Sequence, residues 1–288
     1  MSNPILEGQP PMKEKAKGFQ MIDTHTHVFP DKIAPKVAQN FQAEVGDLLQ
    51  LSGDFTLKDL KAYMKRCGIE AVVTFCLAER PEIVVPANNF LIEIMDNRTI
   101  FSFGTILPNM KDPVGEVRRI REKGVKGIKF HSAFQPIRAR DENLFSIYEA
   151  MAEAGMIAYF HVGKDPVNPS HPPGTSPQDI AHLKERFPPL TIVAAHFGGL
   201  FMLDEARRWI IGRDFYIDTC WGPNIQSLDP GRVVEIIRDH GADKVLLATD
   251  YPSTTDPAPQ IRWFQDLPLR EKERELIFRE NARQLLGV

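Results

Sequence analysis

Two histidines separated by one residue end an apolar segment near the start of the chain. The segment, residues 21–27, reads MIDTHTH and has the composition of a buried strand. Side chains at positions i and i+2 of a strand point to the same face, so the imidazoles of His25 and His27 can converge on one ion. Imidazole nitrogen is a common ligand of zinc and other transition metals. The spacing therefore predicts one part of a metal site at the end of a strand.

Four later apolar segments also end in residue types that bind metals or transfer protons. With the first pair, this set contains five of the eight histidines in the chain. The four residues are His131, His161, His196 and Asp250.

The two histidines of the first strand, with His161 and Asp250, supply three neutral imidazoles and one carboxylate. This donor set suits Zn²⁺ and is acceptable for Mn²⁺, Fe²⁺ or Co²⁺. A bound metal lowers the pKa of its water from 15.7 to about 7, which makes hydroxide available at neutral pH. His196 is placed to move protons, and Asp250 can both bind the metal and accept a proton.

The elements that must position these residues follow a regular alternation. Short runs rich in Val, Ile and Phe predict eight strands, and segments of helical period lie between them, often ending at a glycine before the next strand. This order is typical of a closed (β/α)8 TIM-type barrel, whose strand ends carry the active site, and is also compatible with an open doubly wound sheet. The predicted strands are 19–25, 70–76, 100–106, 126–131, 157–162, 190–195, 214–219 and 244–249.

The predicted barrel occupies residues 19–288 as one catalytic domain, preceded by an N-terminal extension at 1–18. Two stretches, 28–55 and the proline-rich 164–177, are longer than a minimal barrel requires. Both follow strands, so we expect both to lie over the active face.

Composition excludes several classes of partner. The 288 residues are 43% hydrophobic and 25% charged, with a net charge of −3, so no positive field attracts nucleic acid or an anionic membrane. No apolar run is long enough for a membrane span. The three cysteines are few and widely spaced, which fits a reducing cytoplasm.

The combined pattern resembles the amidohydrolase superfamily, in particular the amidohydrolase-related branch that includes aminocarboxymuconate-semialdehyde decarboxylase. The resemblance rests on IDTHTH at 22–27, His161, HFGG at 196–199, ATDYP at 248–252 and NARQLLG at 281–287. It implies that His196 contacts the substrate or the metal-bound water, and it makes a homodimer an expectation. It also implies four metal ligands, which are His25, His27, His161 and Asp250.

Four further residues have open roles. Lys129 matches the position where binuclear amidohydrolases carry a carbamylated lysine between two metals, but a contact to a substrate anion or a structural ion pair is also compatible. His131 is a substrate-pocket residue or a core histidine, and Trp221 lines the pocket or packs in the core. Asp23 lies two residues before His25, so in a regular strand its side chain is on the same face as the two histidines. We expect it to orient a ligand or to close the barrel floor.

The main function expected from these features is metal-dependent hydrolysis. Hydroxide on one divalent ion, expected to be zinc, would attack an amide, ester or lactone of a small molecule, with His196 and Asp250 as catalytic residues. The alternative is a lyase that uses the same ion, a non-oxidative decarboxylase of a small carboxylic acid. A third alternative is a metal-binding barrel without catalysis. As for the number of ions, a second metal on carbamylated Lys129 is less favoured than a single ion.

Overall fold

The computed structural model describes residues 20–164 and 174–288. The predicted extension at 1–18 and most of the proline-rich stretch lie outside the described residues. Eight parallel strands form two hydrogen-bonded groups, β1-β2-β3 and β4-β5-β6-β7-β8. The strands are β1 (Met21–His27), β2 (Ile69–Phe75), β3 (Ile100–Phe103), β4 (Gly127–Phe130), β5 (Ile157–Phe160), β6 (Thr191–Ala194), β7 (Tyr216–Asp218) and β8 (Val245–Leu246).

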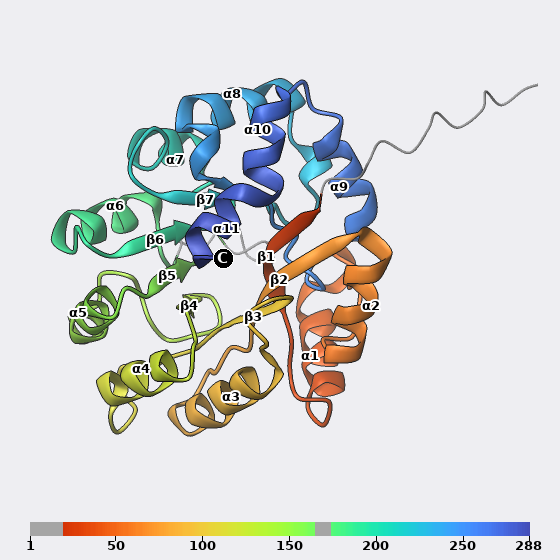
Figure 1. Cartoon of the computed structure of the whole chain (residues 1–288). Coiled ribbons are helices and arrows are strands. Elements are labelled where there is room, and N and C mark those ends of the chain that lie inside the picture. Colours follow the sequence, from red (N-terminus) through yellow and green to blue (C-terminus); the bar gives the residue numbers. More distant parts are fainter. Residues whose placement is uncertain (1–19, 165–173) are drawn as a thin grey trace, which may run out of the picture.

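Backbone contacts join the two groups of strands into a barrel. A parallel bridge between Gly104 and Ile128 connects the end of β3 to β4, and one between Thr26 and Tyr251 connects β1 to the segment after β8. The Thr24 N–H also donates to the Leu247 carbonyl at 2.9 Å. The predicted (β/α)8 barrel is therefore confirmed, and Figure 1 shows its strands surrounded by helices.

The helices alternate with the strands along the chain, and the 28–55 stretch after β1 adds a helix of its own. The α-helices are α1 (Ala34–Val45), α2 (Leu57–Cys67), α3 (Pro81–Ile94), α4 (Pro113–Glu122), α5 (Phe145–Glu153), α6 (Pro177–Arg186), α7 (Leu203–Trp209), α8 (Pro230–His240), α9 (Pro257–Gln265), α10 (Glu271–Glu275) and α11 (Asn281–Leu286). The shorter helical turns are η1 (Gly46–Leu48), η2 (Glu142–Leu144), η3 (Ile225–Ser227), η4 (Ala242–Lys244) and the π-helical η5 (Leu276–Glu280).

Strand side chains alternate between two apolar cores, as the period of two requires. On β2, Val72 packs outward with the helices, whereas Val73 and Phe75 belong to a separate interior cluster. Helix α11 contributes Ala282 and Leu286 to this interior cluster and lies across the barrel in Figure 1. The interior is therefore a packed core at one end, which leaves the other end for the site. No helix in the described ranges is long and apolar enough to cross a membrane.

His240, at the end of α8, predicts a pH dependence of stability. Its Nδ1 accepts from the Gly212 N–H, its Nε2 donates to the Phe215 carbonyl, and burial lowers its pKa to about 4. The unfolded chain, with a pKa near 6.5, binds the proton first, so stability is lost as pH falls from about 6.5 to about 4, by up to about 3 kcal/mol from this group.

We expect His240→Gln to lose less stability than the unmodified chain over that pH interval. The measurement is urea unfolding at pH 7.5, 6.5, 5.5 and 4.5 with a chelator present, so that metal binding does not contribute. The matched control is His182→Gln, on α6. If the free energy of unfolding changes with pH equally in His240→Gln and in the unmodified chain, the pKa of His240 is not lowered by folding.

Candidate metal centre

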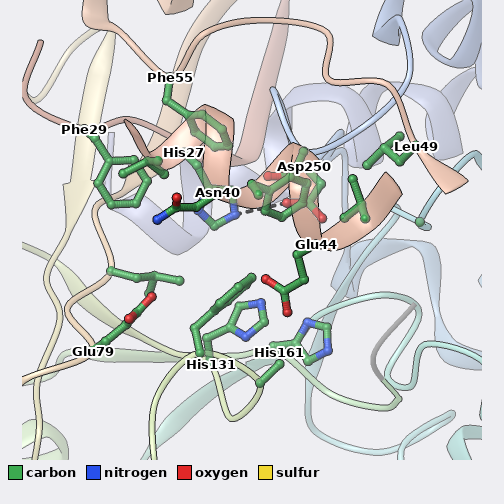
Figure 2. Close-up of a pocket in the computed structure, with 18 of the residues that line it drawn as sticks. His27, Phe29, Asn40, Glu44, Leu49, Phe55, Glu79, His131, His161 and Asp250 are labelled. Atoms are coloured by element: carbon green, nitrogen blue, oxygen red, sulfur yellow. Dashed lines mark hydrogen bonds and ion pairs between the residues drawn. The ribbon is translucent and has the colours of Figure 1, made fainter. Parts of the chain in front are cut away.

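A cavity of about 550 Å³ opens at the C-terminal ends of the strands. Histidines and Asp250 form part of its wall, and the stretch after β1, including α1, forms much of the rest, so the expectation that 28–55 lies over the active face is met. Figure 2 shows the side chains that line this cavity. Its predicted site residues are His27, His131, His161, His196 and Asp250.

Three of the predicted metal ligands converge at the ends of β1 and β8. The Asp250 Oδ1 atom lies 3.0 Å from His27 Nε2 and 3.4 Å from His25 Nε2. Their donor atoms all lie within 4.8 Å of one another, which is close enough to share one ion. These contacts join residues more than 220 positions apart, and the closure of the barrel makes them possible.

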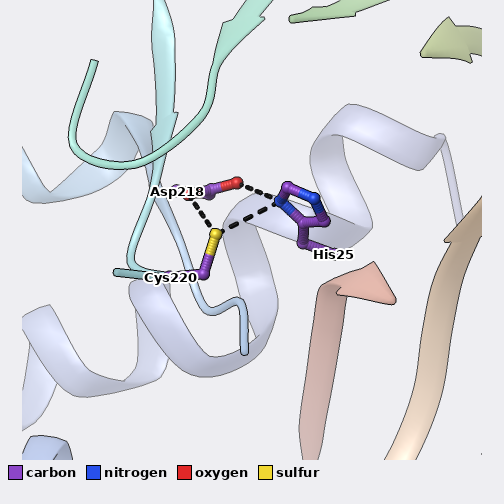
Figure 3. Close-up of side chains that lie close together, drawn as sticks. All are labelled: His25, Asp218 and Cys220. Atoms are coloured by element: carbon purple, nitrogen blue, oxygen red, sulfur yellow. Dashed lines mark hydrogen bonds and ion pairs between the residues drawn. The ribbon is translucent and has the colours of Figure 1, made fainter. Parts of the chain in front are cut away.

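Asp218, at the end of β7, fixes the orientation of His25. Its Oδ2 accepts from His25 Nδ1 at 2.8 Å, as Figure 3 shows. The same oxygen accepts from the Tyr159 hydroxyl at 2.6 Å. Because a carboxylate only accepts, the His25 proton lies on Nδ1, and the Nε2 lone pair faces Asp250. The sequence reading missed Asp218, although an aspartate that ends the otherwise apolar β7 is a signal of the same kind as Asp250.

Cys220 lies inside the same hydrogen-bond network (Figure 3). Its thiol donates to Asp218 Oδ1 at 3.1 Å and lies 3.2 Å from Nδ1 of His25. The sulfur also lies 3.1 Å from Nδ1 of His196. Burial, with the nearby Asp218 carboxylate, raises the pKa of Cys220 well above its ordinary value, so the group is a neutral thiol. The three side chains in Figure 3 are joined by hydrogen bonds, and we interpret them as the support of His25.

His161 and His196, from the ends of β5 and β6, form a second pair. His161 Nδ1 and His196 Nε2 are 2.8 Å apart, and His196 Nδ1 lies 3.3 Å from the Cys220 carbonyl. A proton on His196 Nδ1 satisfies that carbonyl, so His196 Nε2 accepts from His161 Nδ1. The buried Nε2 of His161 then keeps a lone pair, and it has no hydrogen-bond partner among the described residues.

Gly163 allows the two strand ends to approach. Its φ is 108°, and a Cβ atom built there would lie 2.3 Å from the Leu200 backbone nitrogen. Gly163 forms a parallel bridge with Leu200, which closes the space between the segments after β5 and β6. A side chain at this position would push His161 away from His196.

The electrostatics of the site match a metal-binding state. Burial lowers the pKa values of His25 and His161 well below the ordinary range and that of His196 to about 3, so these imidazoles are neutral. Burial alone would raise the pKa of Asp250, but His25, His27 and Lys129 lower it, so the carboxylate is ionised. Neutral imidazoles and an ionised carboxylate are the forms that bind metals.

Lys129 on β4 is fully buried beside these donors. Its Nζ lies 3.0 Å from His25 Nε2 and above the rings of Phe75 and Tyr159. A metal ion and a Lys129 ammonium would therefore compete for the same lone pair. Burial lowers the Lys129 pKa to about 8, which reduces the free energy needed to remove its proton.

These observations fit a single metal ion. His25, His27 and Asp250 bring their donor atoms within 4.8 Å of one another, whereas His161 is not part of this group. The protons on His25 Nδ1 and His161 Nδ1 are held by Asp218 and His196. The Nε2 of His161, which has no partner among residues 20–164 and 174–288, is the strongest single observation, because a buried nitrogen without a partner costs stability unless a ligand uses it.

A bulge in β1 changes the predicted role of Asp23. The register shifts between Asp23 and Thr26, and Asp23 points outward to Tyr63 of α2, so the prediction that it closes the barrel floor is wrong. The other alternative, that it orients a ligand, fits its contact with the His25 N–H. Its Oδ2 accepts from the hydroxyls of Tyr63 and Thr249, each at 2.6 Å, and its Oδ1 accepts from the backbone N–H groups of His25 and Thr249. Burial raises its pKa to about 6, against the opposing effect of these hydrogen bonds.

Asp23 thereby ties the two metal-ligand segments together. Asp250 has a φ of 65°, a backbone conformation that is rare outside glycine and costs about 1 to 3 kcal/mol. Its N–H donates to the His25 carbonyl at 2.9 Å, directly beside the Thr249 contacts to Asp23. The network holds this conformation in place.

The other predicted substrate contacts are placed differently from one another. His131 lines the cavity, and its ring stacks on His161 at 4.2 Å between centroids. Trp221 is buried against Phe201, at 5.5 Å between ring centroids, and is not among the cavity-lining residues, so the packing alternative describes its position.

We expect Asp218→Asn to weaken metal binding without preventing it. The amide can present an N–H to His25 Nδ1, which disturbs the proton position that frees Nε2, and changes of this kind typically reduce metal affinity about 10-fold to 100-fold. The measurement is a competition titration of Mn²⁺ against a fluorescent chelator. The control is Asp239→Asn at an exposed ion pair with Arg207, and equal affinity in the two variants would contradict the role of Asp218.

Comparison with known families decides the wider relationship. The profile described as Amidohydrolase matches residues 22–288. The chain belongs to the amidohydrolase family. The family predicted from the sequence is thus confirmed, and no protein of curated function matches the sequence significantly.

Solved structures of this amidohydrolase fold agree with the chain over nearly all its length. The 5-carboxyvanillate decarboxylase from Sphingomonas paucimobilis has a TM-score of 0.70 at 15% identity, covering 94% of this chain and 100% of that one. The 2,6-dihydroxybenzoate decarboxylase from Rhizobium has a TM-score of 0.68 at 19% identity, with coverages of 94% and 99%. A dihydroxybenzoic acid decarboxylase from Polaromonas sp. JS666, with bound manganese and the inhibitor 2-nitroresorcinol, has a TM-score of 0.68 at 18% identity, with coverages of 94% and 97%. At these identities the likeness establishes a shared fold.

The same comparisons correct the main function predicted from the sequence. Hydrolysis of an amide, ester or lactone is wrong as the leading reading, because the similar structures with a specific named reaction are decarboxylases. The physical reason is that the histidine and aspartate motifs specify how an ion is held and are indifferent to the bond that is broken.

Proposed function

We propose that this protein is a metal-dependent, non-oxidative decarboxylase of a small carboxylic acid. The observation that carries the metal requirement is the buried Nε2 of His161, a cavity-lining residue, which has no hydrogen-bond partner in the part of the chain that the structure describes. The decarboxylases that share the fold support the reaction class.

The proposed cofactor is one divalent cation. Its ligands would be His25, His27, His161 and Asp250, and Zn²⁺ remains the sequence prediction. The manganese in the Polaromonas decarboxylase supports Mn²⁺ as the first ion to test. When bound, the ion supplies a Lewis acid for the oxygen atoms of the substrate.

The cavity wall contributes by excluding water from the carboxylate that is lost. Much of the wall is apolar, including Phe29, Leu77 and Leu200. A carboxylate is poorly stabilised beside such side chains, whereas neutral carbon dioxide is not penalised there. Desolvation therefore favours breaking the bond between the carboxyl carbon and the substrate.

A proton must replace the departing carboxyl group, and we assign its delivery to Asp250. The Asp250 side chain is 20% exposed and lines the cavity, so water can restore its proton. Because its pKa is lowered, the Asp250 carboxylate is ionised at neutral pH and must first take up a proton from water before it can transfer one to carbon. His196 is 1% exposed and bonded through both ring nitrogens, so we assign it the positioning of His161.

The test uses metal-loaded protein and a panel of hydroxylated aromatic acids that includes 2,6-dihydroxybenzoate and 5-carboxyvanillate. We expect release of carbon dioxide from at least one acid, lost on chelation and restored by Mn²⁺ or Zn²⁺. Asp250→Asn should reduce the rate at least 100-fold. Turnover of ester, lactone or amide probes without any acid being decarboxylated would contradict the proposal.

Lys129→Ala tests the number of ions. With a single-ion site, we expect about one equivalent of metal in both the variant and the unmodified chain by elemental analysis. If carbamylated Lys129 bridged two ions, the variant would contain half the metal of the unmodified chain. Lys129→Met is the matched control, because it also removes the amine but keeps a side chain of similar length.

The remaining expectations from the sequence stay predictions. They are the small-molecule substrate, the cytoplasmic location, the homodimer and the single catalytic domain at 19–288. Size-exclusion chromatography with light scattering tests the homodimer.

A further inference from the structure

Helix α1 presents an apolar stripe to the cavity instead of to a protein core. Its members recur about every four residues, from Ile33 at the N-cap of α1, along one face of α1, to Leu48 in η1. Two of them, Ile33 and Leu48, are 44% and 46% exposed, although both belong to the cavity wall. We define the α1 stripe as Ile33, Val37, Phe41, Val45 and Leu48.

Aromatic rings continue this surface to the predicted metal ligands. The Phe41 ring lies 6.1 Å from Phe55 and 6.4 Å from Phe134. Phe134 in turn lies 4.6 Å from His131, whose ring stacks on His161. The α1 stripe and the ligand cluster are therefore two ends of one cavity.

The size of the cavity exceeds what a single-ring acid fills. A cavity of about 150 Å³ is enough to hold benzene, whereas this cavity measures about 550 Å³. Asn40 and Glu44 add polar groups along the same face of α1, and Figure 2 shows both among the cavity side chains. A mostly apolar wall with a few polar groups is the usual form of a site for an amphipathic small molecule.

We propose that the substrate carries an apolar alkyl or aryl group on the side remote from its carboxylate, and that the α1 stripe binds this group. The inference rests on the proposed function for the placement of the carboxylate at the metal end. The stripe then determines specificity, because the metal cluster binds any carboxylate and the apolar contacts distinguish among them.

The test measures binding rather than turnover. Benzoate, 4-ethylbenzoate and 4-butylbenzoate are titrated by calorimetry into metal-loaded, full-length protein. We expect affinity to rise by about threefold for each added methylene, so that 4-butylbenzoate binds at least tenfold more tightly than benzoate. No gain with chain length, or no binding of any probe, would overturn the proposal.

Val37→Asp places a charge in the α1 stripe, and Gln39→Asp places the same charge at an exposed position of the same helix that is not part of the cavity wall. The gain in affinity with alkyl chain length should disappear in Val37→Asp and persist in Gln39→Asp. If Val37→Asp retains the gain, the apolar group binds elsewhere and the proposal fails.

This result is separable from the proposed function. If affinity rises with alkyl chain length but the protein decarboxylates no acid, the apolar binding role of the α1 stripe is supported and the proposed reaction is rejected. If the protein decarboxylates an acid but affinity does not rise with alkyl chain length, the proposed reaction is supported and the role of the α1 stripe is rejected.

Discussion

The double variant His25→Ala/His27→Ala should contain no metal above background and show no metal-dependent activity. It removes two of the three donor groups of the cluster formed by His25, His27 and Asp250, and loss of two ligands leaves too few donors for a stable site. Elemental analysis after dialysis against a metal buffer measures the content. We expect about one equivalent in the unmodified chain.

The control for this experiment is His182→Ala, which removes a histidine on α6 and should retain all of the metal. Circular dichroism checks that the double variant is folded, because His25 also takes part in the Asp218 network. Equal metal contents in the folded double variant and the control would refute the assignment of the β1 histidines.

Asp23→Ala should have the largest effect on stability. The substitution leaves the buried hydroxyls of Tyr63 and Thr249 and two backbone N–H groups without their acceptor. Unsatisfied buried donors of this kind cost about 1 to 3 kcal/mol each, with partial relaxation, so we expect the free energy of unfolding to fall by about 3 to 5 kcal/mol.

Chemical denaturation with a chelator present measures this loss without any contribution from metal. Tyr63→Phe removes one of the four hydrogen bonds and should cost about 1 kcal/mol. Asp47→Ala, at an exposed position of η1, is the control and should be nearly neutral. A loss below 1 kcal/mol for Asp23→Ala would show that the network is not required to hold β1 against the segment after β8.

Much of the barrel could be predicted because its signals are local. The β2 segment Ile69–Phe75 is a β-rich apolar run, and Gly68 after α2 has a φ of 69°, as a helix-ending glycine predicts. The ends of the shortest strands were less predictable: β8 comprises Val245–Leu246, whereas the sequence predicts 244–249. Pairing across the barrel decides where a ladder stops, and that information is not local.

The residues of the site also divide into those with a local sequence signal and those whose placement depends on distant parts of the chain. His27 and Asp250 could be located because each ends an apolar run, and their convergence followed from the barrel. The outward turn of Asp23 could not be predicted, since the β1 bulge depends on the register with β2. Asp218 could have been found from its place at the end of β7, but its bond to His25 spans 193 residues and is visible only in the structure.

Decarboxylation in deuterium oxide is a direct test of the proposed reaction. Metal-loaded protein is incubated with the best acid of the panel, and carbon dioxide and product are quantified together by mass spectrometry and NMR. For each acid consumed, we expect one carbon dioxide released and one deuterium gained at the carbon that lost the carboxyl group. We expect neither in chelator-treated protein or in Asp250→Asn. Carbon dioxide release at the same rate without metal, or acids left intact by metal-loaded protein that hydrolyses esters or lactones, would contradict the proposal.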